Sequence, residues 1–235
     1  MKGILYLIPS TLSDGSVESV IPSEVAVLIK QLTHFAVENE RTARRFLKRV
    51  DSSIDINVLT FVILDKDTAA SGREGMVKLM ESGVNLGVIS EAGCPGIADP
   101  GADLVQLAHQ HKLVIKPLVG PSSILLAMMG SGMNGQSFAF NGYLPVKKAE
   151  KISRLHFFES RSFSEKQAQI FIEAPYRNLQ LLEDILVACK PATRLCIACD
   201  ITSETEMIVT KTIAEWKKSS LPDIQKKPAI FIIQA

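Results

Sequence analysis

Residues Leu86–Gly101 read Leu-Gly-Val-Ile-Ser-Glu-Ala-Gly-Cys-Pro-Gly-Ile-Ala-Asp-Pro-Gly. The stretch begins as an apolar run, which predicts a buried strand. It continues as a loop rich in glycine and proline, in which Glu91 and Asp99 are the only charged residues. Glycine lets another backbone or a ligand come close, and α/β proteins bind small molecules at the carboxyl ends of parallel strands. The alternative is a tight surface connection, and composition alone does not choose between the two.

The residues around this stretch alternate between strand and helix patterns. Apolar runs predict strands at 3–8, 34–38, 59–64, 84–90 and 113–116. Helical spacing of apolar residues predicts helices at 22–32, 41–50, 73–81 and 103–109. Such alternation is typical of a parallel sheet covered by helices on both faces.

The segment Pro117-Leu-Val-Gly-Pro121 interrupts this alternation, and we expect a domain boundary there. The predicted domains are 1–117, with a mostly parallel sheet, and 118–235. In the second domain several strands follow one another without a helix, which predicts a mixed sheet. Its predicted strands are 138–143, 168–173, 193–199, 206–210 and 229–234, and its predicted helices are 122–129, 147–158, 177–188 and a short one around Trp216. Two such domains imply a cleft between them, which the loop at 90–101 and the corner at 120–123 should face.

Composition excludes several classes of protein. Apolar residues make up 46% of the chain, which is enough for a sizeable core and argues against disorder. The 26 Lys and Arg nearly balance the 25 Asp and Glu, so no overall field draws the chain to nucleic acid or to a membrane. No apolar run approaches the ~18 residues needed to span a bilayer, and the apolar segment at the amino terminus is too short for a signal peptide. We therefore expect a cytoplasmic protein.

The motifs for metals and common cofactors are missing from the sequence. Cys196 and Cys199 form a Cys-x-x-Cys without a second pair, inside a strand pattern that points residues three apart to opposite faces. The sequence contains neither the glycine fingerprint of dinucleotide-binding proteins nor a phosphate loop. We expect the cysteines to be buried thiols of a reducing compartment and expect no metal site.

Several segments in order along the chain resemble the tetrapyrrole-methylase superfamily, the class III S-adenosylmethionine-dependent methyltransferases. These segments are Val88–Gly101, Pro117–Ser123, Phe140–Lys147, Phe171–Arg177 and Ala198–Glu206. Within the superfamily, the likeness is to the branch that methylates a ribose of small-subunit ribosomal RNA. The resemblance covers essentially the whole chain, and it implies two α/β domains with a cofactor cleft between them.

The resemblance also implies where the cofactor binds. In this superfamily S-adenosylmethionine lies folded in the interdomain cleft and is held largely by backbone groups. The positions that correspond here are Pro9, Ala92, Gly93, Ile97, Asp99, Ser122 and Ser123. A helix amino terminus such as that at Ser122 or Ser123 can also bind an anionic group, although an ordinary serine cap explains the same residues.

The chain departs from the family pattern at segments expected to face the substrate: Thr11–Asp14, Glu38–Arg41, Asp65–Thr68 and Ser203. Our candidates for proton handling are Glu38 and Glu173. Our candidates for substrate binding are Glu40, Arg41, Arg45, Lys147 and Arg177. For any one of these carboxylates, a structural ion pair is the alternative to catalysis, and for the basic helix faces it is a solvated surface.

The function that the resemblance implies is transfer of a methyl group from S-adenosylmethionine to a ribose 2′-hydroxyl of small-subunit ribosomal RNA. The implied partners are that RNA or the small ribosomal subunit and a second copy of the chain, with no membrane and no DNA. Two alternatives remain: methylation of a corrin or another small molecule, and a non-catalytic protein that binds S-adenosylmethionine or the ribosome. The chain has few aromatic residues, so the sequence does not predict base stacking.

Overall fold

The structure is a computed structural model that describes residues 1–235. It divides into two compact units, Met1–Ser122 and Ser123–Ala235. The division lies after the boundary expected at Pro117. The segment that follows Pro117 stays with the first unit, because the Leu118 amide donates to the carbonyl of Leu7 at 3.0 Å.

The first unit is built on a sheet of five parallel strands in the order β3-β2-β4-β1-β5. The strands are β1 (Ile4–Ile8), β2 (His34–Val37), β3 (Thr60–Ile63), β4 (Leu86–Ile89) and β5 (Val114–Pro117). The helices are α1 (Ser23–Ile29), α2 (Glu40–Val50), α3 (Ala70–Glu81) and α4 (Gly101–Gln110), with a 3-10 turn η1 (Ile56–Val58). The parallel sheet predicted from the strand–helix alternation is confirmed.

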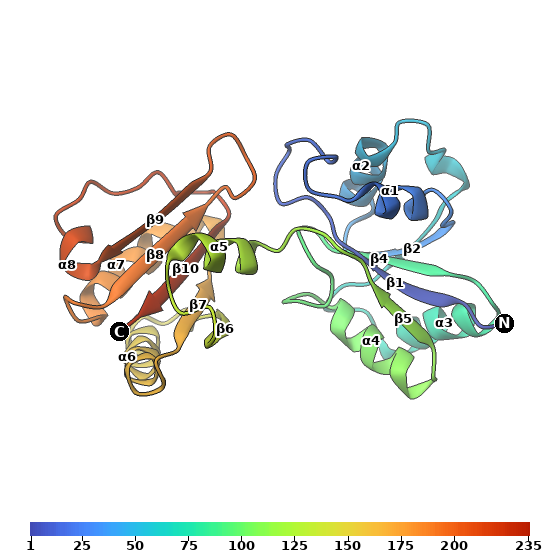
Figure 1. The fold of residues 1–235 in the computed structure, drawn as a ribbon. Helices are drawn as coiled ribbons and strands as arrows, with labels where there is room; N and C mark the ends of the chain where they lie inside the picture. The colour runs from blue at the N-terminus through green and yellow to red at the C-terminus, as the bar shows by residue number, and fades with distance from the viewer. The chain divides into compact units, whose positions relative to one another are not determined.

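Helices cover both faces of this sheet, as Figure 1 shows. Side chains of β1 alternate between the two layers: Tyr6 and Ile8 pack with residues of α1 and α2, whereas Leu5 and Leu7 pack with residues of α3 and α4. This alternation follows from the two-residue period of a strand. Both faces of the sheet are therefore apolar.

The second unit holds a mixed five-stranded sheet in the order β6-β7-β10-β8-β9. Only β6 and β7 are parallel, and the other neighbours are antiparallel, which confirms the predicted mixed sheet. The strands are β6 (Phe138–Tyr143), β7 (Ala168–Ile172), β8 (Arg194–Cys199), β9 (Met207–Thr212) and β10 (Ala229–Gln234). The helices are α5 (Ser123–Ser131), α6 (Lys148–Glu165), α7 (Asn178–Ala188) and α8 (Ile213–Trp216), with a 3-10 turn η2 (Pro175–Arg177).

The core of the second unit lies between its sheet and the helices α6, α7 and α8. Leu155 and Phe158 of α6 and Ile185 of α7 pack there against Phe171 and Phe231 of the sheet. Helix α6 runs to Glu165 instead of ending at residue 158 as the sequence suggested. Its last turns contain buried polar residues that the chain satisfies: the Glu159 carboxylate accepts from Thr193 and from the Lys190 amide, and the Ser162 hydroxyl accepts from the Ala235 amide.

The cysteines are all free thiols. Burial raises the pKa of Cys189 to about 12 and that of Cys199 to about 11, so both thiols stay protonated at neutral pH. Protonated buried thiols are weak nucleophiles and poor metal ligands. None of the helices combines the length and apolar character needed to cross a bilayer.

Candidate functional site

Three loops of the first unit meet at the carboxyl edge of its sheet, and we call them the three-loop cluster: Pro9–Ser10 after β1, Ser90–Cys94 after β4 and Gly120–Pro121 after β5. The carbonyl of Gly93 accepts hydrogen bonds from the Ser10 amide at 2.9 Å and from the buried Ser90 hydroxyl at 3.0 Å. The Cys94 thiol donates to the carbonyl of Pro121 at 3.4 Å. The loop after β4 is thereby hydrogen-bonded both to the loop after β1 and to the loop after β5, and each of these bonds involves a backbone carbonyl.

Two positions of the three-loop cluster require glycine. Gly93 has a φ of 75°, in the left-handed region that glycine favours. A Cβ atom on Gly120 would lie 2.2 Å from Cγ of Pro9, closer than atoms can approach. The cluster is thus a backbone surface with little side-chain volume: close approach explains the glycine at 120, and the backbone conformation explains the glycine at 93.

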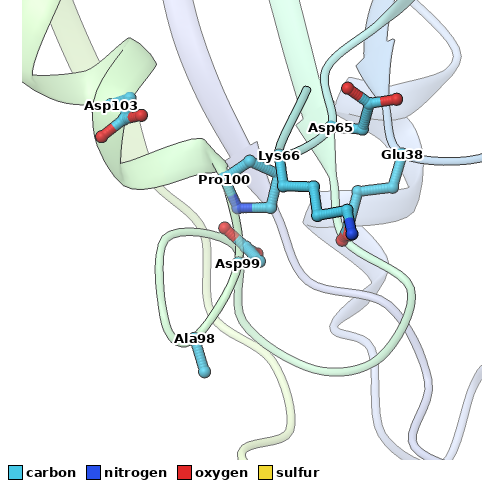
Figure 2. A pocket seen from close by; sticks show the side chains of 7 residues that line it. All are labelled: Glu38, Asp65, Lys66, Ala98, Asp99, Pro100 and Asp103. Atoms are coloured by element: carbon cyan, nitrogen blue, oxygen red, sulfur yellow. The ribbon is translucent and has the colours of Figure 1, made fainter. Parts of the chain in front are cut away.

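An open pocket of about 650 Å³ lies at the same edge of the sheet. Figure 2 shows the residues that line it: Glu38 after β2, Asp65 and Lys66 after β3, Ala98, Asp99 and Pro100 from the loop after β4, and Asp103 from the first turn of α4. An adjoining recess shares Glu38 and Asp99 with the pocket and reaches Ser90 of the three-loop cluster. The pocket is acidic, since four carboxylates face one lysine.

The carboxyl groups of Glu38 and Asp99 both have perturbed acidities. Burial raises the pKa of Glu38, and the negative charge of Asp99 raises it further, while a hydrogen bond from the Glu91 amide acts in the opposite sense. Burial also raises the pKa of Asp99, against the two amides, of Gly96 and Gly101, that donate to its Oδ1 at 2.7 and 2.8 Å. Two neighbouring carboxyls with raised pKa values in a pocket are typical of functional sites.

Two buried polar atoms at this edge have no hydrogen-bond partner: Ser10 Oγ and Asp99 Oδ2. Buried polar atoms in folded proteins are normally satisfied, and an unsatisfied one costs about 1–3 kcal/mol. Both atoms can accept a hydrogen bond from a ligand. The pocket and the three-loop cluster therefore present acceptors and negative charge to a ligand that carries donors or positive charge.

The expected cofactor residues fall into three places. Pro9 and Gly93 lie in the three-loop cluster, and Asp99 lies in the pocket. Ala92 is an exposed residue of the three-loop cluster, and Ile97 is exposed on the loop between that cluster and Asp99. Ser122 ends the first unit and Ser123 begins the second, at the first residue of α5.

The substrate candidates of the first unit lie on α2, which follows Glu38 directly. Asn39 caps this helix by accepting from the Arg41 amide at 2.9 Å. Glu40 forms an ion pair with Arg44. The side chains of Arg41 and Arg45 are exposed and form neither an ion pair nor a hydrogen bond, so both guanidinium groups are available to a ligand.

The remaining candidates, Glu173, Lys147 and Arg177, belong to the second unit. The Glu173 side chain is buried, and its Oε1 accepts from Arg177 Nη2 at 2.7 Å and from Arg177 Nε at 2.9 Å. Lys147 is exposed and pairs with Glu150 at 3.3 Å. Glu173 is thus engaged in an ion pair, whereas Glu38 accepts no side-chain hydrogen bond.

Sequence reasoning missed Ser10 and Asp103 at this edge, and it placed Asp65, Lys66 and Gly120 only within segments expected to face the substrate or the cleft. The available signal was position, because Ser10, Asp65 and Gly120 each follow a strand of a parallel sheet within a few residues. The carboxyl ends of such strands share one edge. Which of these side chains approach one another depends on the strand order, which the sequence does not state.

Replacing Glu38 with Gln should raise the melting temperature at pH 7 by a few degrees at most. The pKa of Glu38 is raised in the folded protein, so ionisation costs stability above the folded pKa. That cost shrinks as the pH falls through the raised folded pKa and is gone below the ordinary Glu value of 4.5, so the advantage of Gln should disappear over the same range. Thermal unfolding at pH 7 and at a pH below 4.5 measures the difference in melting temperature between Glu38→Gln and the wild type. The exposed Glu74→Gln is the control and should leave the melting temperature unchanged at either pH. An unchanged or lower melting temperature at pH 7 would contradict the burial of this charge.

The fold is shared with several solved methyltransferases. The crystal structure of the methyltransferase CobJ matches with a TM-score of 0.65 and 16% identity, over 100% of this chain and 94% of that one. Uroporphyrin-III C-methyltransferase from Thermus thermophilus, in a complex with S-adenosylhomocysteine, matches with a TM-score of 0.55 and 16% identity over 99% and 97%. The chain has the tetrapyrrole-methylase fold.

Family models give no match to the chain, but curated proteins do. Ribosomal RNA small subunit methyltransferase I of Vibrio cholerae is 29% identical over 212 residues, 90% of this chain and 69% of that protein. The protein of the same name from Streptococcus pyogenes is 29% identical over 223 residues (95% and 70%), and that from Buchnera aphidicola is 26% identical over 221 residues (93% and 74%). This chain is a methyltransferase homologous to ribosomal RNA small subunit methyltransferase I.

Proposed function

We propose that the protein transfers a methyl group from S-adenosylmethionine to a ribose 2′-hydroxyl of small-subunit ribosomal RNA. The observation that carries this proposal is the extent of the match, since the relatives named above align with 90–95% of the chain. The branch suggested by the sequence motifs is the same one. The cytoplasm is the compartment in which we expect this substrate, and a homodimer is the assembly that we expect.

S-adenosylmethionine fits the residues at the carboxyl edge of the first unit. The cofactor carries a sulfonium and an ammonium group, and the pocket beside the three-loop cluster is acidic. Its donors can satisfy Ser10 Oγ and Asp99 Oδ2, which have no partner within the chain. The cofactor, when bound, supplies a methyl group on an electron-poor sulfur. We propose that Pro9, Gly93 and Asp99 hold it, together with Ser122 and Ser123, while Ala92 and Ile97 flank it.

The residues of the chain then have to position a hydroxyl and accept its proton. We propose Glu38 as the group that accepts the proton, because its raised pKa brings it closer to the working pH, where a general base is most effective. The unpaired Arg41 and Arg45 on α2 suit contacts with RNA phosphates. Because Glu173 is already paired with Arg177, we propose that it orients Arg177 toward the substrate, with Lys147 beside it, and that it does not itself take up a proton.

The deciding experiment uses small ribosomal subunits from a strain that lacks the corresponding methyltransferase. We expect the protein to transfer labelled methyl groups from S-adenosylmethionine to the RNA of these subunits and not to a uroporphyrin-type tetrapyrrole. Transfer to the tetrapyrrole alone would replace the proposal with the small-molecule alternative. Tight binding of S-adenosylhomocysteine in calorimetry without transfer to either acceptor would favour a non-catalytic protein.

Replacing Asp99 with Ala should weaken the binding of S-adenosylhomocysteine by about tenfold or more. The change removes the acceptor for the Gly96 and Gly101 amides, and each lost hydrogen bond to a charged group is worth about 1.5–3 kcal/mol. The matched control is Asp103→Ala, which removes another carboxylate of the pocket but no such backbone contact. Calorimetry measures both variants. Equal, small losses would show that Asp99 does not shape the binding loop.

A further inference from the structure

Arg177 is held rigidly at the carboxyl end of β7. Two of its guanidinium nitrogens donate to the same oxygen of Glu173, at 2.7 and 2.9 Å. The Arg177 side chain is 28% exposed, whereas the Glu173 side chain is 1% exposed. The carboxylate is therefore a buried anchor, and the guanidinium that it holds remains open to solvent.

A buried lysine also pairs with the Glu173 carboxylate. Lys151 of α6 is 2% exposed, and its Nζ lies 4.0 Å from Glu173 Oε2 and 3.1 Å from Asp184 Oδ2. The Glu173 carboxylate is thus engaged on both oxygens. Since a buried charge cannot leave its partners without a large cost, the orientation of Arg177 is set before any ligand arrives.

Two exposed tyrosines accompany Arg177. Tyr176 precedes it, and the guanidinium lies 5.3 Å from the Tyr176 ring centroid. Tyr143 ends β6 and pairs with Ile172, the residue before Glu173. Tyr143 and Tyr176 are 61% and 62% exposed, whereas the third tyrosine of the chain, Tyr6, is buried. The pKa of Arg177 is raised, chiefly by its hydrogen bonds to Glu173, with smaller electrostatic contributions from Tyr176 and Tyr143.

Further positive charges lie along the segments next to these tyrosines. Lys147 and Lys148 follow Tyr143 by four and five residues, at the start of α6. Their side chains are 82% and 69% exposed, and they pair with Glu150 at 3.3 Å and with Asp184 at 3.8 Å. Lys226 is held against η2, since its amide donates to the Pro175 carbonyl at 2.9 Å. The same segment is tied by Gln225, whose side chain donates to the Tyr176 carbonyl at 2.9 Å. Aromatic faces and cations therefore gather at one end of the two parallel strands.

We propose that Tyr143, Tyr176 and Arg177 form a site on which unpaired bases of the RNA substrate stack, with Lys147, Lys148 and Lys226 along the backbone of the same strand. The site deepens the proposed function and rests on it. Exposed aromatic rings beside cations are how proteins bind single-stranded nucleic acid, because every base has a face that can stack. With few aromatic residues in the chain, the sequence did not predict base stacking. The fold instead places two of the three tyrosines of the chain beside one fixed arginine.

The test compares two probes with the full-length protein: a fluorescent oligoadenylate of about ten nucleotides and an abasic strand of the same length. Tyr143→Ala and Tyr176→Ala should each weaken oligoadenylate binding at least about fivefold and leave abasic-strand binding unchanged. Tyr143→Phe and Tyr176→Phe keep the ring and should bind oligoadenylate as the wild type does. Phe163→Ala, which removes an exposed ring elsewhere on the second unit, is the matched control and should change nothing.

Methyl transfer to small ribosomal subunits separates this inference from the function on which it rests. For the alanine variants we expect KM to rise with kcat retained and with unchanged melting temperatures. If the wild type methylates the subunits and both tyrosine variants keep its affinity and KM, the stacking site is overturned and the function stands. If the wild type methylates only a tetrapyrrole and binds neither probe, both are overturned. If the alanine variants lose affinity equally for oligoadenylate and for the abasic strand, stacking is also overturned, because the tyrosines would then contact the nucleic-acid backbone and not the bases.

Discussion

Replacing Lys151 with Met should destabilise the second unit by about 3–5 kcal/mol, the cost of removing one partner from a buried ion pair. Lys151 is almost fully buried between Glu173 and Asp184. Methionine fills a similar volume, but it removes the positive charge that pairs with the buried carboxylates of Glu173 and Asp184. Urea unfolding, followed by the fluorescence of Trp216 in the same unit, measures the loss.

Two further variants test the cause of that loss. Lys147→Ala, four residues earlier and exposed, should cost less than about 0.5 kcal/mol. Adding Asp184→Asn to Lys151→Met should restore about 1–3 kcal/mol, because it removes the carboxylate that depends most on Lys151. Glu173 keeps its ion pair with Arg177, whereas Asp184 keeps an ion pair with Lys148 at 3.8 Å and a hydrogen bond from Gln180 at 3.3 Å. If the double variant is less stable than Lys151→Met, charge burial is not the reason for the loss.

Replacing Gly120 with Ala should lower the rate of methyl transfer by about a hundredfold, the cost of misplacing reacting groups by about 1 Å. The new Cβ would lie 2.2 Å from Cγ and 2.4 Å from Cβ of Pro9. A proline ring cannot rotate away as a flexible side chain could, so the loops after β1 and β5 have to separate. We also expect a loss of about 1–3 kcal/mol in stability from overpacking.

The control for this change is Gly135→Ala, because a Cβ on Gly135 meets nothing within 4 Å and its φ is not positive. It should leave both the melting temperature and the methyl-transfer rate unchanged. Transfer to small ribosomal subunits and binding of S-adenosylhomocysteine are measured for both variants. Full activity of Gly120→Ala would mean that the three-loop cluster tolerates expansion and does not position the cofactor.

Much of the fold could be predicted because it depends on local patterns. The apolar runs that became β1, β4 and β10 are continuous, as strands buried on both faces must be. The sequence predicted helix starts at residues 22 and 41, each within one residue of the observed starts of α1 at Ser23 and α2 at Glu40. The helix that ran longer than expected, α6, contains Glu159 and Ser162, which resemble surface residues in sequence and are satisfied by groups far away in the chain.

In the candidate site, too, some features could be predicted from local sequence and others depend on distant contacts. The glycine-rich loop after β4 and the carboxylate of Glu38 could be found from composition and from position after a strand. Glu173 resembles Glu38 in sequence, as a carboxylate that follows a parallel strand. It differs because Arg177 and Lys151 occupy its oxygens, and one of these partners comes from another helix.

The sequence by itself determined the parallel and mixed sheets, the backbone character of the loop at Leu86–Gly101 and the resemblance to the methyltransferases. These depend on residue type and on spacing along the chain. Tertiary structure alone decided that Gly93 bonds Ser10 while Cys94 bonds Pro121, and that Glu38 shares a pocket with Asp99. It also decided that Tyr143, from the neighbouring strand, lies at the same end of β7 as Tyr176 and Arg177. The physical reason is that such contacts follow from strand order and from the packing of distant side chains, and neither leaves a local pattern in the sequence.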